Sequence, residues 1–198
     1  MYKPTKIIRT ILLCVSVILT IGAAKAAYPD KPVKIIIGFP AGGPLDAHIR
    51  LLVDKLQTAL GQTVIVDYKA GAGGAVGAQF VAQSQPDGYT LLLANTGTMV
   101  INPAIYTKSP YDTLKDFQPI ARTAQQPLAL IVNKDIAANS LKEFVAYAKA
   151  NPGLLNYGSA GNGGISHLVP EMLKNETGIF MVHIPFKGSA PAFTDLIA

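Results

Sequence analysis

The sequence predicts an α/β fold in which mainly parallel strands are joined by crossover helices. Two observations carry this prediction. Short apolar or β-branched segments recur along the chain, and each precedes a segment whose apolar residues return every three or four positions. The connections from strand-like to helix-like segments are rich in glycine, as in GFPAGG, KAGAGG and GSAGNGG. Such regular alternation is typical of parallel sheets with helical crossovers.

The first half of the chain begins with the apolar run VKIII at residues 33–37, which is the first expected strand. A helix is expected over residues 46–60, because its apolar residues keep helical spacing and Gly61 follows as a stop signal. The other expected elements of this half are a strand at 63–68, a helix near 75–83 and a strand at 89–95.

The second half opens with Ser140 and Glu143, whose spacing is that of a capping box. It predicts a helix that begins after Ser140 and ends at the Asn-Pro-Gly turn of residues 151–153. The expected elements after it are a strand at 154–158, a helix at 168–175, a strand at 181–186 and a helix at 190–197.

The middle of the chain, residues 102–127, interrupts this alternation. It carries prolines at positions 103, 110, 119 and 127 and shows no clear period. A surface loop of that length is uncommon inside a compact domain. We therefore expect a chain crossing between two lobes, with a hinge in this region.

The first 26 residues have the order of a secretory signal peptide. A basic start is followed by a short apolar core and the small-x-small sequence Ala24-Lys25-Ala26. The apolar run is shorter than the roughly 18–20 residues of a spanning helix, so we do not expect a membrane anchor. A lipoprotein signal is rejected because Cys14 lies inside the apolar core, after Leu13. We expect export, with cleavage before Ala27.

The charge of the chain belongs largely to this leader. Removing it takes away four of the 17 Lys and Arg residues and none of the 12 Asp and Glu residues, which leaves a net charge of +1. A nucleic-acid partner is therefore not expected. The single cysteine is removed as well, so the mature chain has no disulfide or thiol chemistry.

Three glycine-rich loops follow expected strands, at residues 39–46, 69–77 and 158–167. In open parallel sheets, ligands bind outside the carboxyl ends of the strands, where such loops lead into helices. Glycine allows close backbone approach, and a helix start presents unpaired N–H groups to an anion. The loops predict a receptor site for a carboxylate or phosphate that needs no Lys or Arg. The alternative is that the glycines serve only tight turns.

Catalytic and metal motifs are not found. The glycines of residues 71–77 are one position too widely spaced for a dinucleotide fingerprint, and Tyr157 occupies a glycine position of the nucleophile elbow. The three histidines lack metal spacing. We expect His48 on a helix surface, His183 in the core or on a cleft wall, and His167 as a candidate for ligand contact beside a glycine loop.

Four stretches resemble the Bug-type periplasmic receptors of tripartite tricarboxylate transporters. They are YPDKPVKIIIGFPAGGPLDAHIRLL, KAGAGGAVGAQFVAQSQPDGYTLLLANTGTMVINPAIY, NYGSAGNGGISHL and MVHIPFKGSAPAFTDLIA, in the order of the family and over essentially the whole mature chain. The resemblance implies a two-lobed periplasmic-binding-protein-like (type II) fold with mainly parallel sheets. Its domains are a signal peptide (1–26), a first α/β lobe (27–103), and a hinge crossing with a partial second lobe (104–198).

The resemblance also implies a function. It is capture of a small carboxylate, such as a dicarboxylate, a tricarboxylate, an acidic amino acid or an aromatic acid, between the lobes in the periplasm. The partners are the membrane permease subunits; no cofactor, metal, catalysis or stable membrane insertion of the mature chain is implied. The first loop is implied to hold the ligand carboxylate, and polar positions face it across the cleft. The implied ligand-binding residues are Phe39, Ala41, Gly42, Gly43, Asn95, Thr96, Ser159, Gly161, Ser166 and His167.

Two departures from the family pattern set further expectations. Pro170 is tolerated if its helix starts near His167, because an early proline forfeits no intrahelical bond. The family continues well beyond the position of Ala198, so we expect an incomplete second lobe. Its exposed apolar surface is expected around Ile184, Phe186, Phe193 and Leu196.

Two alternatives and one expectation remain. A truncated relic that binds nothing stays open, as does an exported enzyme acting on a small organic acid, although no nucleophile–base pair is evident. We also expect a Gly43→Val substitution to weaken ligand binding, because the turn is expected to require close backbone approach.

Overall fold

A computed structural model describes residues 27–198, and the expected signal peptide lies outside these residues. The segment Lys31–Ala198 forms one compact unit. Its first sheet is made of β1 (Val33–Ile37), β2 (Val64–Tyr68) and β3 (Thr90–Leu93), all parallel, in the order β2-β1-β3. The register places Ile35 of the central strand opposite Val66 and Leu91. The α/β prediction with parallel strands is confirmed.

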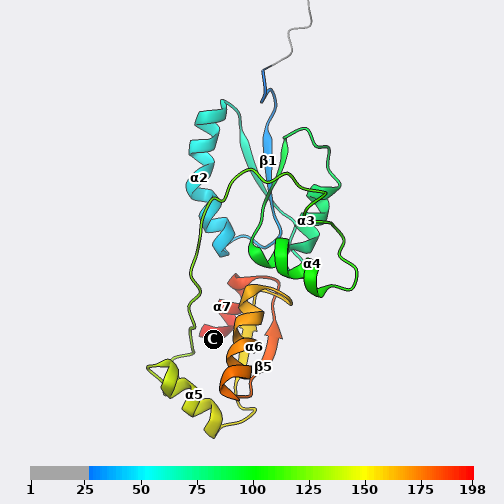
Figure 1. Cartoon of the computed structure of the whole chain (residues 1–198). Helices are drawn as coiled ribbons and strands as arrows, with labels where there is room; N and C mark the ends of the chain where they lie inside the picture. Colours follow the sequence, from blue (N-terminus) through cyan, green and yellow to red (C-terminus); the bar gives the residue numbers. More distant parts are fainter. Residues whose placement is uncertain (1–26) are drawn as a thin grey trace, which may run out of the picture. The chain divides into compact units, whose positions relative to one another are not determined.

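Helices cover both faces of this sheet (Figure 1). The long helix α2 (Pro44–Leu60) packs on the face of Ile35 and Ile37, together with Leu91 and Leu93. On the other face, Leu92 packs in the cluster that contains α3 (Ala75–Ala82). Side chains of a strand alternate between faces, so β3 supplies apolar groups to both cores. The result is a doubly covered sheet with a central strand that is almost completely buried.

The second half of the chain contains a two-stranded parallel sheet. Its strands are β4 (Asn156–Ser159) and β5 (Val182–Pro185). The helices of this half are α5 (Leu141–Ala150), α6 (Ile165–Thr177) and α7 (Ser189–Ile197). A separate apolar core joins α5 to the residues that enter the two strands: Phe144, Ala148, Leu155, Ile179 and Met181.

The predicted capping box is present at the start of α5. The Ser140 hydroxyl accepts the Glu143 N–H at 3.2 Å, so one of the orphan donors of the helix start is satisfied. The Glu143 carboxylate reaches back to the N–H of Asn139 at 2.7 Å, one residue before the position that the motif predicts.

The irregular segment was predicted to begin at residue 102, and this prediction is wrong. A π-helix, η2 (Gly97–Ile101), and a short helix, α4 (Asn102–Ile105), follow β3 directly. Pro103 does not prevent this helix, because the first helical turn has no intrahelical N–H bond to lose. From residue 106 to residue 140 the structure has neither helix nor strand. The predicted lobe boundary at 103/104 falls within α4, and the division into lobes stays a prediction.

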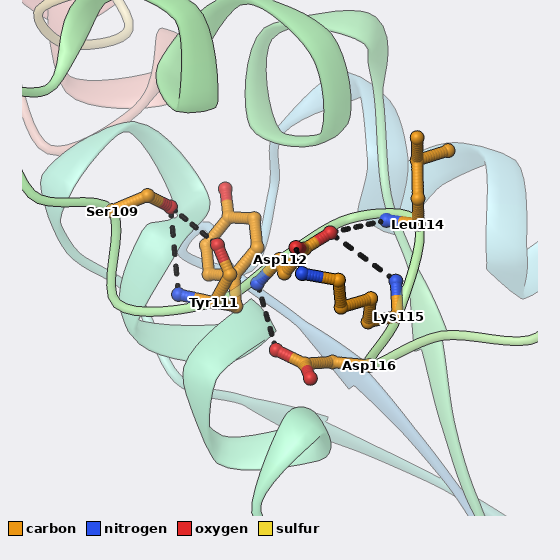
Figure 2. A network of polar contacts seen from close by, with 6 residues as sticks. All are labelled: Ser109, Tyr111, Asp112, Leu114, Lys115 and Asp116. Carbon is orange, nitrogen blue, oxygen red and sulfur yellow. Dashed lines mark hydrogen bonds and ion pairs between the residues drawn. The ribbon is translucent and has the colours of Figure 1, made fainter.

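The segment after α4 is anchored by a compact turn, which Figure 2 shows. The carboxylate of Asp112 accepts the N–H groups of Leu114 at 3.0 Å and Lys115 at 3.2 Å, and Asp116 accepts the N–H of Asp112 at 2.7 Å. Beside it the buried Tyr111 donates its hydroxyl to the Thr98 carbonyl. The hydrogen bond from Tyr111 therefore links this turn to η2.

The helix predicted at residues 168–175 begins earlier, at Ile165, so the condition under which Pro170 is tolerated is not met. Pro170 is the sixth residue of α6 and lies beyond the turn in which a proline costs no hydrogen bond. An ordinary residue at this position would donate to the Ser166 carbonyl. That helical bond is absent in α6.

The apolar exposure expected in the second half is found at two of four positions. Ile184 and Phe193 are 39% and 45% exposed, whereas Phe186 and Leu196 are half-buried. Among residues 27–198, no helix combines the length and the apolar character needed to span a bilayer.

Candidate functional site

Four strand-to-helix loops meet at one cavity of about 330 Å³. Residues 38–39 follow β1, residues 71–74 follow β2, residues 160–162 follow β4 and residues 185–187 end β5 and lead to α7. Tyr106, directly after α4, completes the lining. These loops follow the carboxyl ends of parallel strands, where ligands are expected to bind, and each loop leads into a helix.

Three of these four loops were identified from the sequence. The fourth, which contains Phe186 and Lys187, was not, although the strand and helix on either side of it were predicted. The strand–helix step alone could have indicated it. Within the described part of the chain, Lys187 is the only charged residue that lines the cavity, so the expectation of a site without Lys or Arg needs this correction.

The loop after β1 is in close backbone contact with the loop after β2 and with the start of α3. A Cβ atom at Gly38 would lie 2.6 Å from the Cα of Gly74, and one at Gly77 would lie 2.7 Å from the Cα of Gly38. Gly74 also has a φ of +94°, and its Cβ would lie 2.2 Å from the Thr98 hydroxyl. Only glycine combines this conformation with this space.

Side chains from η2 and α4 hold the second wall by its carbonyl groups. The Gly73 carbonyl accepts from Asn102 Nδ2 at 3.0 Å and from Thr98 Oγ1 at 3.1 Å, and both side chains are buried. The Tyr106 hydroxyl donates to the Ala72 carbonyl at 3.2 Å. Both carbonyl oxygens of this wall therefore have hydrogen-bond partners within the protein.

Asp46 holds the first loop. Its carboxylate is 4% exposed and accepts the Gly42 N–H at 2.8 Å and the Tyr68 hydroxyl at 2.5 Å, while Arg50 Nε lies 2.9 Å away. Burial alone would raise the pKa of Asp46, but the hydrogen bonds from Tyr68, Gly42 and Arg50 and the Arg50 charge together lower it. Asp46 was not among the predicted site residues.

The third loop is held in the same way by three predicted site residues. Ser166 Oγ accepts the Ala160 N–H at 3.0 Å, Ser159 Oγ accepts the Gly161 N–H at 3.2 Å, and His167 Nδ1 accepts the Gly163 N–H at 3.2 Å. None of these three side chains lines the cavity.

The other predicted residues have different surroundings. Phe39 and Gly161 line the cavity. Asn95 Oδ1 accepts the Thr98 N–H at 2.9 Å and lies 3.1 Å from the Thr98 hydroxyl, whose single proton it shares with the Gly73 carbonyl. Thr96 is exposed. The remaining three continue the first loop next to Phe39 without reaching the lining: Ala41, Gly42 and Gly43.

Two single-residue expectations differ from the structure. Gly43 has a φ of −85° and its Cβ would make only an ordinary contact, 3.6 Å from the Pro40 carbonyl oxygen, so the steric basis for the Gly43→Val prediction is absent. His48 is half-buried rather than on the helix surface, and its Nε2 has no hydrogen-bond partner among residues 27–198.

Comparison with known proteins identifies the family. The model of the tripartite tricarboxylate transporter family receptor matches residues 48–198. The chain belongs to this receptor family. BugT of Bordetella pertussis (strain Tohama I) is 37% identical over 86% of the chain and 52% of its own length. A protein encoded in the tcbD-tcbE intergenic region of Pseudomonas sp. (strain P51) is 34% identical over 96% of the chain and 57% of its own length.

Solved receptors have the same fold. An R. palustris protein with adipate superimposes with a TM-score of 0.83 at 33% identity, over 85% of the chain and 56% of that structure. MatC from Rhodopseudomonas palustris with bound malate gives 0.79 at 32% identity, over 85% and 57%. The periplasmic binding protein BugD gives 0.75 at 37% identity, over 85% and 56%. The expected periplasmic-binding-protein type of fold is confirmed, and the chain spans just over half the length of these receptors.

The Gly74 contact predicts a steric penalty that can be separated from backbone strain. We expect Gly74→Ala to lower the free energy of unfolding by at least ~1 kcal/mol more than Gly178→Ala, because Thr98 must move and lose its hydrogen bonds. Gly178 is the matched control: its φ is +69°, but nothing lies within 4 Å of its Cβ position. Urea denaturation measures both losses, and equal losses would contradict the prediction.

The Asp46 network predicts a pH-dependent contribution to stability. Because folding lowers the pKa of Asp46 below 3.8, its carboxylate stabilises the native state above about pH 4, and this contribution is lost as the pH falls through the lowered pKa. We expect Asp46→Asn to lower the melting temperature at pH 7 and to lower it progressively less as the pH falls below about 4. The exposed Asp54→Asn on the same helix should change little at either pH; a similar loss from both variants would show that the network is not responsible.

Proposed function

We propose that this chain binds a small carboxylate in the four-loop cavity, as the receptor component of a tripartite tricarboxylate transporter. The observation that carries the proposal is the composition of the cavity wall. Residues of four strand-to-helix loops line it, seven of the thirteen lining residues are glycine or alanine, and Lys187 is among the others. Over residues 27–198, no Asp or Glu is among the lining residues.

The electrostatics of this wall favour an anion. Three of the helices that follow the loops begin at Ala75, Ile165 and Ser189, and a helix start carries unpaired N–H groups and a partial positive charge. The fourth, α2, already has the carboxylate of Asp46 in its first turn. Lys187 adds a full charge. A cavity of about 330 Å³ is at the small end of ligand sites, which suits an acid of few carbon atoms.

The known receptors support the ligand class. The two R. palustris structures that share this fold contain adipate and malate, both of which carry two carboxylates. A dicarboxylate places one charge near the helix starts and leaves a second for Lys187. We therefore propose a dicarboxylate as the first class to test.

The enzyme alternative has one observation in its favour. Ser159 Oγ lies 2.6 Å from His183 Nε2, a nucleophile–base distance that the sequence did not reveal. The Ser159 side chain is fully buried, however, so a substrate has no access to it. This geometry suits a structural role and supports the receptor proposal over catalysis.

The ligand proposal predicts binding that depends on charge. We expect malate and adipate to raise the melting temperature, and uncharged adipamide to leave it unchanged. Because Lys187 is the charged lining residue, Lys187→Gln should weaken malate binding roughly tenfold, about 1.4 kcal/mol, and reduce its salt dependence. Calorimetry gives the affinities.

The control for this experiment is Lys142→Gln, an exposed lysine on α5. It should bind malate like the unaltered chain. A panel of carboxylic acids without any melting shift would instead favour the relic alternative, and equal binding by the Lys187 and Lys142 variants would remove Lys187 from the site.

We also propose that the chain is exported and acts in the periplasm with permease subunits of the transporter. The basic, apolar and Ala-Lys-Ala order of residues 1–26 supports export. N-terminal sequencing of the chain recovered from the periplasm should begin at Ala27 or within two residues of it. Recovery of cytoplasmic protein that starts at Met1 would contradict this.

A further inference from the structure

Three rings from three different elements form a stack behind the third wall of the cavity. The rings of Tyr157 on β4 and His183 on β5 have centroids 4.9 Å apart at 21°. His167 on α6 stacks on His183 as well, with centroids 4.1 Å apart at 14°. All three residues are half-buried. The stack connects the two strands whose ends form two walls of the cavity.

Ser159 connects this stack to the loop. Its hydroxyl lies 2.6 Å from His183 Nε2, accepts the Gly161 N–H and is 3.2 Å from the Gly161 carbonyl. A hydroxyl has one proton to donate and two lone pairs. Every group has a partner when His183 Nε2 carries its proton and donates to Ser159, while Ser159 donates to Gly161. In this arrangement His183 is a support and does not act as a base.

His167 connects the stack to the next turn of the same loop. Its Nδ1 accepts the Gly163 N–H at 3.2 Å, which requires that Nδ1 carry no proton. Gly163 has a φ of +75°, and a Cβ there would lie 2.4 Å from the side chain of Ile105. At Gly163 the loop is therefore limited by packing against Ile105 and held by the hydrogen bond to His167 Nδ1.

The surroundings of the stack keep His183 neutral and Glu171 ionised. Burial, and then the neighbouring His167, lowers the pKa of His183, so His183 resists a second proton. On α6, hydrogen bonds from Lys174 and then Tyr157 lower the pKa of Glu171, with a further contribution from His167. Glu171 therefore remains a carboxylate. Lys174 lies 2.8 Å from Glu171.

We propose that Ser159, His183 and His167 are positioning residues for the loop of residues 160–163, of which residues 160–162 line the cavity, and that protonation of His167 on Nδ1 releases Gly163 and loosens this wall. A protonated Nδ1 is a donor facing the Gly163 N–H donor. Because the wall requires an unprotonated Nδ1, acid favours the loosened loop. The consequence for ligand affinity rests on the proposed function, whereas the consequence for the loop does not.

The loop is tested first without ligand. Amide hydrogen exchange of Gly163, followed by NMR between pH 8 and pH 5 and corrected for intrinsic rates, should lose roughly tenfold protection in acid. His167→Asn places an amide oxygen near the position of Nδ1 and does not titrate, so its protection should not depend on pH. His48→Asn, the remaining histidine, should behave like the unaltered chain. Protection that is independent of pH in the unaltered chain, or equally dependent on pH in His167→Asn, would overturn the proposal.

The support by His183 is tested by rescue. The amide of His183→Gln retains an N–H donor near the position of Nε2, whereas His183→Phe retains only a ring. We expect Gly161 protection to persist in the Gln variant and to fall in the Phe variant. If the Phe variant does not fold, Ser159→Ala, which removes the same hydrogen bonds, provides the comparison. Undiminished protection in both His183→Phe and Ser159→Ala would contradict the support role.

Malate affinity is measured last, as the ratio of the dissociation constants at pH 5.5 and pH 7.5. Malate itself changes charge between these two pH values, but this effect is the same for the unaltered chain and for His167→Asn. It therefore cancels when the two ratios are compared. We expect a ratio about fivefold larger for the unaltered chain. Equal ratios would contradict the link between His167 and the site. If neither protein binds malate or the other acids, the proposed function fails, and the exchange measurements still decide the role of His167.

Discussion

The contact on which the cavity depends is the approach of the end of β1 to the start of α3. Gly38, Gly74 and Gly77 meet there with no room for a Cβ atom on any of them. Backbone in such close contact cannot be hydrated, so its polar groups must find partners within the protein. The buried Thr98 and Asn102 provide them for the adjacent carbonyl of residue 73, and the short helices after β3 place both side chains within reach. The compact turn of Figure 2 is linked to η2 by the Tyr111 hydroxyl, which donates to the Thr98 carbonyl.

The same arrangement recurs around the cavity. Asp46 holds the first loop through Gly42, and Ser159, Ser166 and His167 hold the third loop through three backbone donors. In each case a polar side chain bonds to the backbone of a loop that contributes to the cavity lining. The peptide groups of these loops are thereby held in place by the protein itself. Preorganisation of this kind reduces the ordering cost of binding.

The fold was largely predictable because strand and helix periods are local properties of the sequence. The bounds of β1 agree with the prediction, and α2 starts two residues earlier than expected because proline is compatible with a first helical turn. The helix α4 was missed because it is short and contains Pro103. Three of the four cavity loops were predictable from their glycines, but not the loop of Phe186 and Lys187, nor the roles of Ser166 and His167. Whether such a side chain faces a ligand or its own loop depends on three-dimensional distances that spacing in the sequence does not encode.

The wall composition has a consequence for how ligand preference can diversify. Seven of the thirteen lining residues are glycine or alanine, and several of these glycines cannot change without displacing neighbouring backbone. Because the Tyr106 hydroxyl already holds the Ala72 carbonyl, variation in chemistry is restricted to a few positions, chiefly Phe39, Asn162, Phe186 and Lys187. The glycine-rich backbone can stay unchanged while these four side chains are exchanged. A few substitutions can therefore change the shape and charge of the cavity on a scaffold whose peptide geometry stays the same.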